Sequence, residues 1–168
     1  MKVFDSEYLS KLSADAKRNC RRRQHQNLHS TYEEPFQRLF NAIEPESYIR
    51  PHRHCSDSKD ELLIAIRGLM ALLIFDDDGR VLQIVYFGVD SVADSGVDSV
   101  AAGVEVPPKI WHTVIALEPG SVLFEGKCGP FDLCHPKDLA PWAPAEATDS
   151  AMEYLNELKK KLNRRSLP

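Results

Sequence analysis

The sequence predicts an all-β domain, a barrel or sandwich of short strands with one helix at each end. Three observations support this: many short strand signals separated by turns, one Asp-Gly hairpin signal, and an amphipathic helix pattern near each terminus. A chain of 168 residues fits one domain with its own core. We expect a helix and basic arm over 1–35, the barrel over 36–140, and a Pro-rich segment and helix over 141–168.

Composition narrows the range of partners and compartments. The content of 43% apolar and 27% charged residues is ordinary for a soluble protein, and the formal charge of -4 gives no general attraction to nucleic acid. The longest apolar stretch, Leu69 to Phe75, is much shorter than the roughly 20 residues of a membrane helix. The N-terminus also lacks a signal-peptide pattern. We therefore expect a cytoplasmic protein without a nucleic-acid or membrane partner, and free thiols at its four cysteines.

The first expected element is a short amphipathic helix over residues 5–17. Asp5 and Ser6 are cap-type residues, and the apolar side chains after them recur at helical spacing. The basic run from Arg18 to His29 follows directly as an arm that packs on the barrel. It could bind a phosphate or an acidic sugar, but we interpret it as a solvated surface.

Strand signals occupy the middle of the chain. The turn Asp76-Asp77-Asp78-Gly79 separates two apolar runs, 69–75 and 81–87, which predicts a β-hairpin. A second turn is expected at Glu118-Pro119-Gly120. The remaining strands are expected at 36–41, 48–54, 61–66, 104–106, 111–117 and 122–125.

The Pro-rich stretch 140–146 separates the strands from a final helix. Ser150 and Glu153 fit a capping box at its start. An apolar stripe then predicts packing on the barrel or on a second subunit, and a homodimer formed through a terminal helix would cover the open edges of the barrel. The stripe consists of Ala151, Leu155, Leu158 and Leu162.

The residues with the clearest chemistry are His52, His54, Glu61 and His112. His52 and His54 lie two apart in an extended segment, so their imidazoles project from the same face. Glu61 precedes one apolar strand and His112 begins another, so each can reach the interior from a different strand. Three imidazoles and one carboxylate suit iron, manganese, nickel, cobalt or zinc better than magnesium or calcium. We therefore predict one divalent transition metal.

The spacing of these residues resembles the two sequence motifs of the cupin superfamily. His-x-His is followed by six residues, Glu61, six more and Gly68, and the second motif appears as Pro107-Pro108-Lys109-Ile110-Trp111-His112. The resemblance implies a single double-stranded β-helix, or jelly-roll, barrel. The gap before Glu61 is longer than usual, so Asp57 and Asp60 remain alternative carboxylate ligands, and Lys109 stands where the second motif usually has glycine.

A narrower resemblance extends over nearly the whole chain. The segments that carry it are N-L-H at 27–29, Q-R-L-F-N-A-I-E-P at 37–45, R-P-H-R-H at 50–54, G-P-F-D at 129–132 and A-P-W-A-P at 140–144. They are similar to WbuC-type cupin metalloproteins. Members of that family occur in bacterial surface-polysaccharide (O-antigen) gene clusters, which implies a role in polysaccharide biosynthesis and leaves the reaction unassigned.

Three functions follow from a metal in such a barrel. The first is a metal-dependent isomerase or epimerase, in which the metal holds a carbonyl and a hydroxyl of a sugar or sugar nucleotide while a base moves a proton. The second is an iron(II)-dependent dioxygenase of the three-histidine type, if Glu61 does not coordinate. The third is a non-catalytic module that binds or senses a small ligand through its metal.

Further candidate residues come from their positions near strand ends or near the metal motifs. Because side chains alternate along a strand, Arg53 and Trp111 should point away from the histidines, which favours Arg50 for binding a substrate phosphate. The other candidate for substrate binding is His29. The candidate catalytic residues are Glu125, Tyr86 and Lys109.

Overall fold

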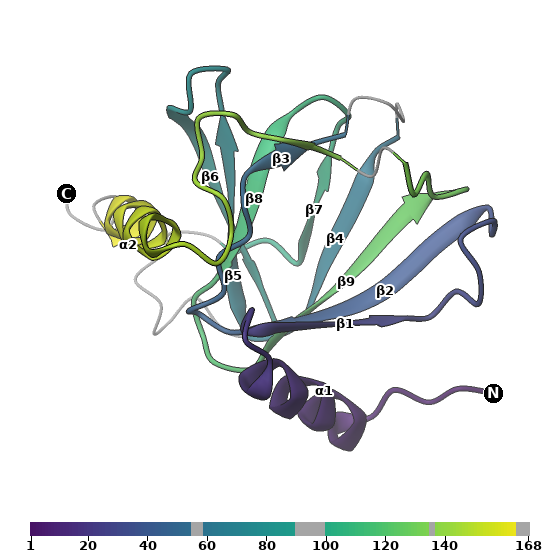
Figure 1. The fold of residues 1–168 in the computed structure, drawn as a ribbon. Helices are drawn as coiled ribbons and strands as arrows, with labels where there is room; N and C mark the ends of the chain where they lie inside the picture. Colours follow the sequence, from purple (N-terminus) through teal and green to yellow (C-terminus); the bar gives the residue numbers. More distant parts are fainter. Residues whose placement is uncertain (55–58, 90–99, 135–136, 164–168) are drawn as a thin grey trace.

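Two antiparallel sheets of five strands face each other in the computed structural model, which describes residues 1–54, 59–89, 100–134 and 137–163 (Figure 1). Sheet A has the order β1-β2-β9-β4-β7 and sheet B the order β10-β3-β8-β5-β6. The strands of sheet A are β1 (Arg23–Asn27), β2 (Phe36–Ile43), β4 (Glu61–Arg67), β7 (Gly103–Val106) and β9 (Ser121–Cys128). Those of sheet B are β3 (His52–Arg53), β5 (Leu69–Phe75), β6 (Val81–Gly88), β8 (Trp111–Ala116) and β10 (Asp138–Leu139).

The strand order is that of a jelly roll. The pairs β5–β6, β4–β7, β3–β8 and β2–β9 are nested within one another along the chain, and they alternate between the two sheets. This is the connectivity of a long hairpin folded over into two facing sheets. The predicted all-β, cupin-type barrel with two helices is therefore confirmed, and β1 and β10 each add an edge strand to it.

The core follows from the alternation of side chains along the strands. One set of apolar residues, which includes Leu63, Leu72 and Val114, fills the space between the sheets. The opposite set in sheet B, which includes Leu73 and Ile115, packs beneath the C-terminal helix. Burying one such side chain contributes about 1.5–3 kcal/mol, so the alternation specifies which face of each strand lies inside.

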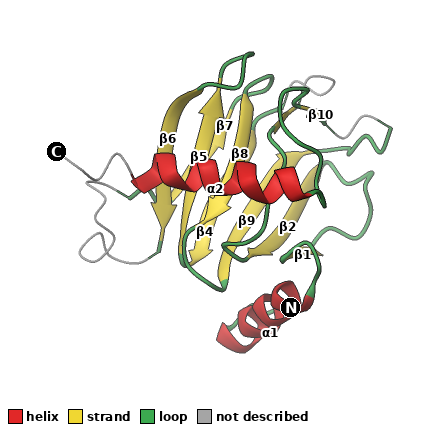
Figure 2. Cartoon of the chain, turned by 60° about the vertical axis from the view of Figure 1, so that its left-hand side comes forward, coloured by secondary structure: helices red, strands yellow, loops and turns green. Residues whose placement is uncertain are grey.

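Each sheet carries one helix on its outer face. Helix α1 (Ser6–Arg18) places Leu9 and Leu12 against Phe40 of sheet A. Helix α2 (Asp149–Asn163) crosses the outer face of sheet B (Figure 2) and buries its leucine stripe there. Both predicted helices are confirmed, and α2 packs on its own barrel.

The Asp-Gly hairpin between β5 and β6 is confirmed. Asp76 Oδ1 accepts hydrogen bonds from the backbone N–H groups of Asp78 at 3.0 Å and Arg80 at 2.8 Å. Gly79 has a φ of 84°, and a Cβ atom there would lie 2.7 Å from the Trp142 ring. Glycine is therefore required by both the backbone conformation and the packing.

Part of the basic run 18–29 forms a strand that was not predicted from the sequence. Residues Arg23–Asn27 form strand β1, which pairs with β2 from Arg23↔Ile43 to Asn27↔Leu39. Most of its side chains are exposed because it is an edge strand, so the strand has no apolar alternation to reveal it. Strand β1 pairs with the edge of β2 that β9 does not occupy.

The start of α2 also differs from the prediction. The backbone N–H of Ala151 donates to Thr148 Oγ1 at 3.2 Å, so the cap lies two residues before Ser150. Ser150 instead contacts the Thr148 hydroxyl at 3.0 Å. Thr148 provides the same cap chemistry two residues earlier in the chain.

Two composition-based expectations can be compared with the described residues. Neither described helix combines the length and apolar character needed to cross a membrane. In the described part of the chain, Cys20, Cys128 and Cys134 are free thiols, whereas Cys55 lies outside it. The predicted boundaries at residues 35 and 140 remain predictions.

Candidate metal centre

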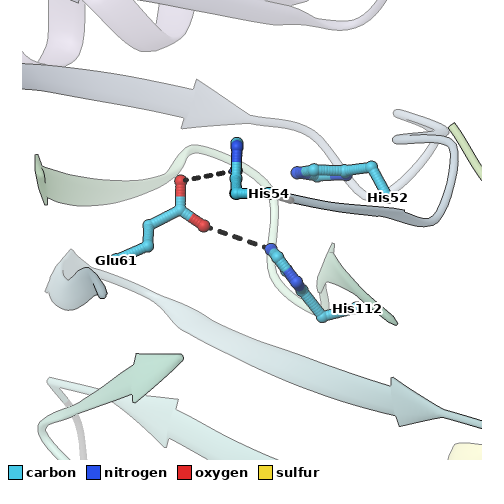
Figure 3. A group of neighbouring side chains, drawn as sticks. All are labelled: His52, His54, Glu61 and His112. Carbon is cyan, nitrogen blue, oxygen red and sulfur yellow. Dashed lines mark hydrogen bonds and ion pairs between the residues drawn. The ribbon is translucent and has the colours of Figure 1, made fainter. Parts of the chain in front are cut away.

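The four predicted ligands converge between the two sheets (Figure 3). His52 in β3 and His112 in β8 are directly paired in sheet B. Glu61 begins β4 in sheet A, and His54 directly follows β3. The backbone N–H of Lys109 donates to the His54 carbonyl at 3.0 Å, which fixes the position of that histidine. The jelly-roll fold therefore unites ligands from three strands and one adjoining residue.

The distances between the donor atoms fit a single ion. All four donors lie within 4.8 Å of one another. Glu61 Oε2 lies 3.1 Å from His112 Nε2, and Glu61 Oε1 lies 3.7 Å from His54 Nε2. Ligands with bonds of about 2.1 Å to one metal are about 3–4 Å apart, so only small movements would bring these atoms onto an ion.

The hydrogen bonds of the histidines provide a separate test of this fit. His52 Nδ1 lies 3.1 Å from the Arg50 carbonyl, and His112 Nδ1 lies 2.8 Å from the Ile110 carbonyl. Such contacts place the proton on Nδ1 and leave Nε2 as a metal donor. His112 Nε2 also faces Glu61, so both of its ring nitrogens meet acceptors although a neutral imidazole has one proton. A cation beside Nε2 would resolve that conflict.

The protonation states also match those of metal ligands. Burial, followed by the charge of Lys137, holds the pKa of His52 well below its ordinary value, so this imidazole is neutral. Burial opposes ionisation of Glu61, but hydrogen bonds with His112 and His54 outweigh burial and hold the pKa of Glu61 well below its ordinary value. A neutral imidazole and an ionised carboxylate are the forms that bind metal.

The two alternative carboxylates are not part of the cluster. Asp60 is exposed, whereas Glu61, the next residue, is 6% exposed and faces the interior. Asp57 lies outside the described residues. The structure therefore brings together His52, His54, Glu61 and His112 as one candidate site, and their coordination of a metal remains a prediction.

Glu125 lies beside this cluster. It belongs to β9, where Leu123 faces the space between the sheets, so the side chain two residues later faces the same interior. Burial, then the charge of Glu61 and a hydrogen bond with it, raise the pKa of Glu125 well above its ordinary value. The structure thus places this predicted catalytic residue at the site, next to a ligand but outside the four-donor set.

Tyr86 lies elsewhere, which contradicts its predicted place at the site. Its neighbours Val85 and Phe87 face the barrel interior, whereas Tyr86 packs with the residues beneath α2. Its hydroxyl donates to the Leu162 carbonyl at 3.0 Å. Neighbouring residues of a strand project from opposite faces of the sheet, so Tyr86 points away from the cluster.

Replacing Tyr86 with phenylalanine is therefore expected to lower stability by about 1 kcal/mol through loss of this hydrogen bond, with the metal content unchanged. Urea unfolding and elemental analysis would measure the two quantities. Tyr154→Phe is the matched control, because the Tyr154 hydroxyl has no hydrogen-bond partner in the described part of the chain. Loss of metal from Tyr86→Phe would contradict this placement.

Lys109 lies near the cluster through its backbone alone. Its side chain is exposed, so the predicted catalytic role receives no support from the structure. Its φ of 68° lies in the left-handed region, which costs a non-glycine residue roughly 1–2 kcal/mol. This conformation explains physically why the cupin motif usually has glycine at that position.

The two predicted substrate-binding residues are engaged with backbone groups. The Arg50 guanidinium donates to the Ala140 carbonyl from Nε at 3.2 Å and Nη2 at 2.6 Å. His29 is buried, and its Nδ1 lies 2.8 Å from the Arg38 carbonyl. Both residues therefore hold neighbouring segments in place, and their predicted contact with a substrate remains untested.

Arg53 and Trp111 point away from the cluster, as the alternation of side chains predicted. The Arg53 guanidinium lies 4.2 Å from the centre of the Trp111 ring, and the indole N–H donates to Asp77 at 2.9 Å. Trp111 also packs in the core beneath α2. These residues stabilise the outer side of sheet B.

Sequence reasoning missed two lysines near the cluster. Lys127 in β9 is 6% exposed and is directly paired with Glu61. Lys137 comes just before β10 and acts electrostatically on His52, Glu125 and Glu61. Alternation from Glu125 could have identified Lys127, but no local pattern marks Lys137.

Comparisons with known proteins support the fold and leave the activity open. A family model described as a domain of unknown function (DUF6016) matches residues 4–87. A search of curated proteins found no match. Protein SO0799 from Shewanella oneidensis has a similar structure, with a TM-score of 0.52 and 10% identity over 68% of this chain and 72% of that chain. At this identity the likeness concerns the fold alone.

Two other solved structures have lower TM-scores. A cupin-2 domain containing protein from Shewanella frigidimarina has a TM-score of 0.44 and 14% identity, over 63% of this chain and 80% of that chain. Oxalate decarboxylase from Bacillus subtilis, a protein with Mn(II) centres, has a TM-score of 0.48 and 15% identity over 70% of this chain. This chain spans only 27% of the length of that protein.

Proposed function

Since the chain belongs to the family described as a domain of unknown function (DUF6016), its activity must be argued from the site, and we propose that it is a metal-dependent enzyme of the isomerase or epimerase type. The observation that carries this proposal is the position of Glu125. A half-buried carboxyl group, that of Glu125, lies beside four metal-type donors and is not one of them. The site thus combines a metal centre with a separate group able to accept and donate a proton.

These positions give the metal and Glu125 separate roles in the proposed reaction. A divalent metal held by the four donors would act as a Lewis acid toward a substrate carbonyl. Glu125 would take a proton from the carbon beside that carbonyl and return it to the same or the neighbouring carbon. One proton is removed from carbon and one is returned to carbon, with exchange against solvent while Glu125 holds it, so the reaction needs no oxidant or reductant.

The walls of the barrel favour such proton transfer by limiting access of water. Ile74 is directly paired with His112, and Val106 is directly paired with Glu61, so two apolar side chains flank the cluster. Both also line a cavity of about 390 Å³ between β6 and β7. This cavity offers space for the apolar face of a ligand beside the metal centre.

The substrate proposed for this activity is a sugar or sugar nucleotide in bacterial surface-polysaccharide biosynthesis, as the WbuC-type resemblance implies. A free sugar in its open-chain form, or a sugar nucleotide that carries a keto group, supplies the adjacent carbonyl and hydroxyl groups that the mechanism needs. The dioxygenase alternative is less favoured, because Glu61 lies among the donors instead of leaving three histidines alone.

The test is solvent exchange followed by NMR. Protein loaded with manganese, iron or zinc would be incubated in D₂O with a panel of sugar nucleotides, and we expect deuterium at one carbon together with a new isomer. Glu125→Gln should lower the exchange rate about 100-fold or more and retain the metal. The matched control is Glu153→Gln at an exposed position of α2, which should leave the rate unchanged.

Three results would contradict the proposal. Exchange that persists in Glu125→Gln would remove this residue from the mechanism. Tight binding of a sugar nucleotide without any exchange would favour the binding module. Oxygen uptake by the iron-loaded protein, without exchange, would favour the dioxygenase.

A further inference from the structure

Two lysines flank the candidate metal centre from opposite sheets. Lys127 belongs to β9 in sheet A and is the direct partner of Glu61, and residues directly opposite one another on paired strands project from the same face. Its ammonium group therefore lies inside the barrel with the Glu61 carboxylate. At 6% exposure this is a buried charge at the edge of the site.

Lys137 approaches from the side of sheet B. It directly precedes β10, where Leu139 is paired with His52. Lys137 is half-buried and lies two residues before Leu139, so it is on the same face of this extended segment as Leu139 and His52. The two lysines therefore contribute positive charge to the same interior from separate segments of the chain.

The charges around the cluster do not balance once a metal is bound. Even with both Glu61 and Glu125 ionised, their two carboxylates only offset the ammonium groups of Lys127 and Lys137. A divalent ion then leaves two positive charges without a counter-charge among these residues. Uncompensated charge in a buried site is costly, so the loaded site favours an anionic ligand.

Asn41 is a buried polar residue deeper in the same interior, opposite Leu123 in the pairing of β2 with β9. It lies in β2 two residues before Ile43, which faces the space between the sheets. Asn41 is 5% exposed, and its Oδ1 has no hydrogen-bond partner in the described part of the chain. A buried amide oxygen without a donor is unfavourable, and a ligand hydroxyl would satisfy it.

We propose that Lys127 and Lys137 form an oxyanion-binding subsite beside the metal centre, and that the ligand is a hydroxylated carboxylate or phosphate. This inference rests on the proposed metal-dependent function, and it narrows the substrate to an acidic sugar or a phosphorylated one.

The experiment compares three sugars by isothermal titration calorimetry on manganese-loaded and metal-free protein. D-Glucuronate tests a carboxylate, D-glucose 6-phosphate tests a phosphate, and D-glucose is the neutral control. We expect at least one of the two anions to bind about tenfold or more tightly than glucose. Tighter binding of glucuronate would identify the ligand's charged group as a carboxylate, and tighter binding of glucose 6-phosphate would identify it as a phosphate.

Variants test whether the preference for anionic sugars depends on Lys127 and Lys137. Lys127→Met and Lys137→Met should each weaken anion binding about tenfold or more. Lys127→Arg keeps the positive charge and should retain much of the parent's affinity. Lys160→Met, at an exposed position of α2, is the matched control and should bind as the parent does. Elemental analysis of each variant would show that the metal is retained, and Lys137→Met tests a half-buried loop position if Lys127→Met does not fold.

The outcomes separate this inference from the proposed function. Retained metal with equal binding of glucose and both anions, or with no effect of either lysine variant, would overturn the subsite. Failure of both anions to bind at millimolar concentration would also overturn it. Lysine-dependent anion binding by a protein that takes up no metal would instead support the subsite and contradict the metal-dependent function.

Discussion

Replacing His112 with alanine is expected to lower metal affinity by more than about 100-fold. Loss of a group that only hydrogen-bonds to a metal ligand typically costs about 10–100-fold in affinity, and this change removes a predicted ligand itself, whose Nε2 lies 3.1 Å from Glu61 Oε2. His52→Ala should have a similar effect, because His52 is paired with His112 across the two strands that hold both. The parent should contain close to one metal ion per chain, and both variants should contain almost none.

Elemental analysis of protein purified without chelators, followed by metal titration, would measure this effect. His25→Gln is a suitable control, since His25 lies in β1 and outside the cluster. Parent protein that neither contains nor takes up a transition metal would contradict the metal centre. Metal that remains in both His112→Ala and His52→Ala would place it elsewhere.

Replacing Glu146 with glutamine is expected to lower the free energy of unfolding by about 2–3 kcal/mol. Arg23 is 5% exposed, and its Nη2 donates to Glu146 Oε1 at 2.8 Å and Oε2 at 2.7 Å. The neutral variant would leave the buried guanidinium without its counter-charge. The contact joins β1 to the Pro-rich segment before α2, so both should loosen together.

The pH dependence of this effect has a definite sign. Burial works to raise the pKa of Glu146, but Arg23 and Arg21 outweigh it and hold the pKa below its ordinary value of 4.5. The contribution of this carboxylate to stability is therefore complete above pH 4.5 and is lost as the pH falls through the lowered pKa. The stability difference between parent and Glu146→Gln should narrow below that pH.

Urea unfolding of both proteins from about pH 7 to about pH 3 would measure this difference. The control is Arg21→Gln, which removes the 56% exposed partner of Glu146 and should cost less than about 1 kcal/mol. Equal stability of parent and Glu146→Gln at neutral pH would show that Arg23 is compensated by other groups.

The candidate metal site was predictable because its signals are local. The spacing of His52 and His54 places both imidazoles on one face of an extended segment. Glu61 and His112 could be added because each stands at the start of a strong apolar strand signal. The helix and hairpin predictions succeeded for the same reason, since helical spacing and the Asp-Gly turn act over a few residues.

Predictions that depended on which face of a strand a side chain projects from succeeded for some residues and failed for others. Tyr86 and Glu125 were chosen on the same grounds, yet one packs beneath α2 and the other lies beside Glu61. A shift of one residue along a strand exchanges its two faces, so nearness to a strand end could not distinguish them.

The sequence by itself determined most of the strands, the two helices and the four residues that can hold a metal, because periodicity and turn chemistry act within short segments. Only the tertiary structure decided that β1 joins sheet A, that Arg23 pairs with Glu146, and that Lys127 lies opposite Glu61 of the candidate metal site. These contacts join residues far apart in the chain. Their partners are chosen by the nested pairing of the jelly roll, for which no single segment carries a signal.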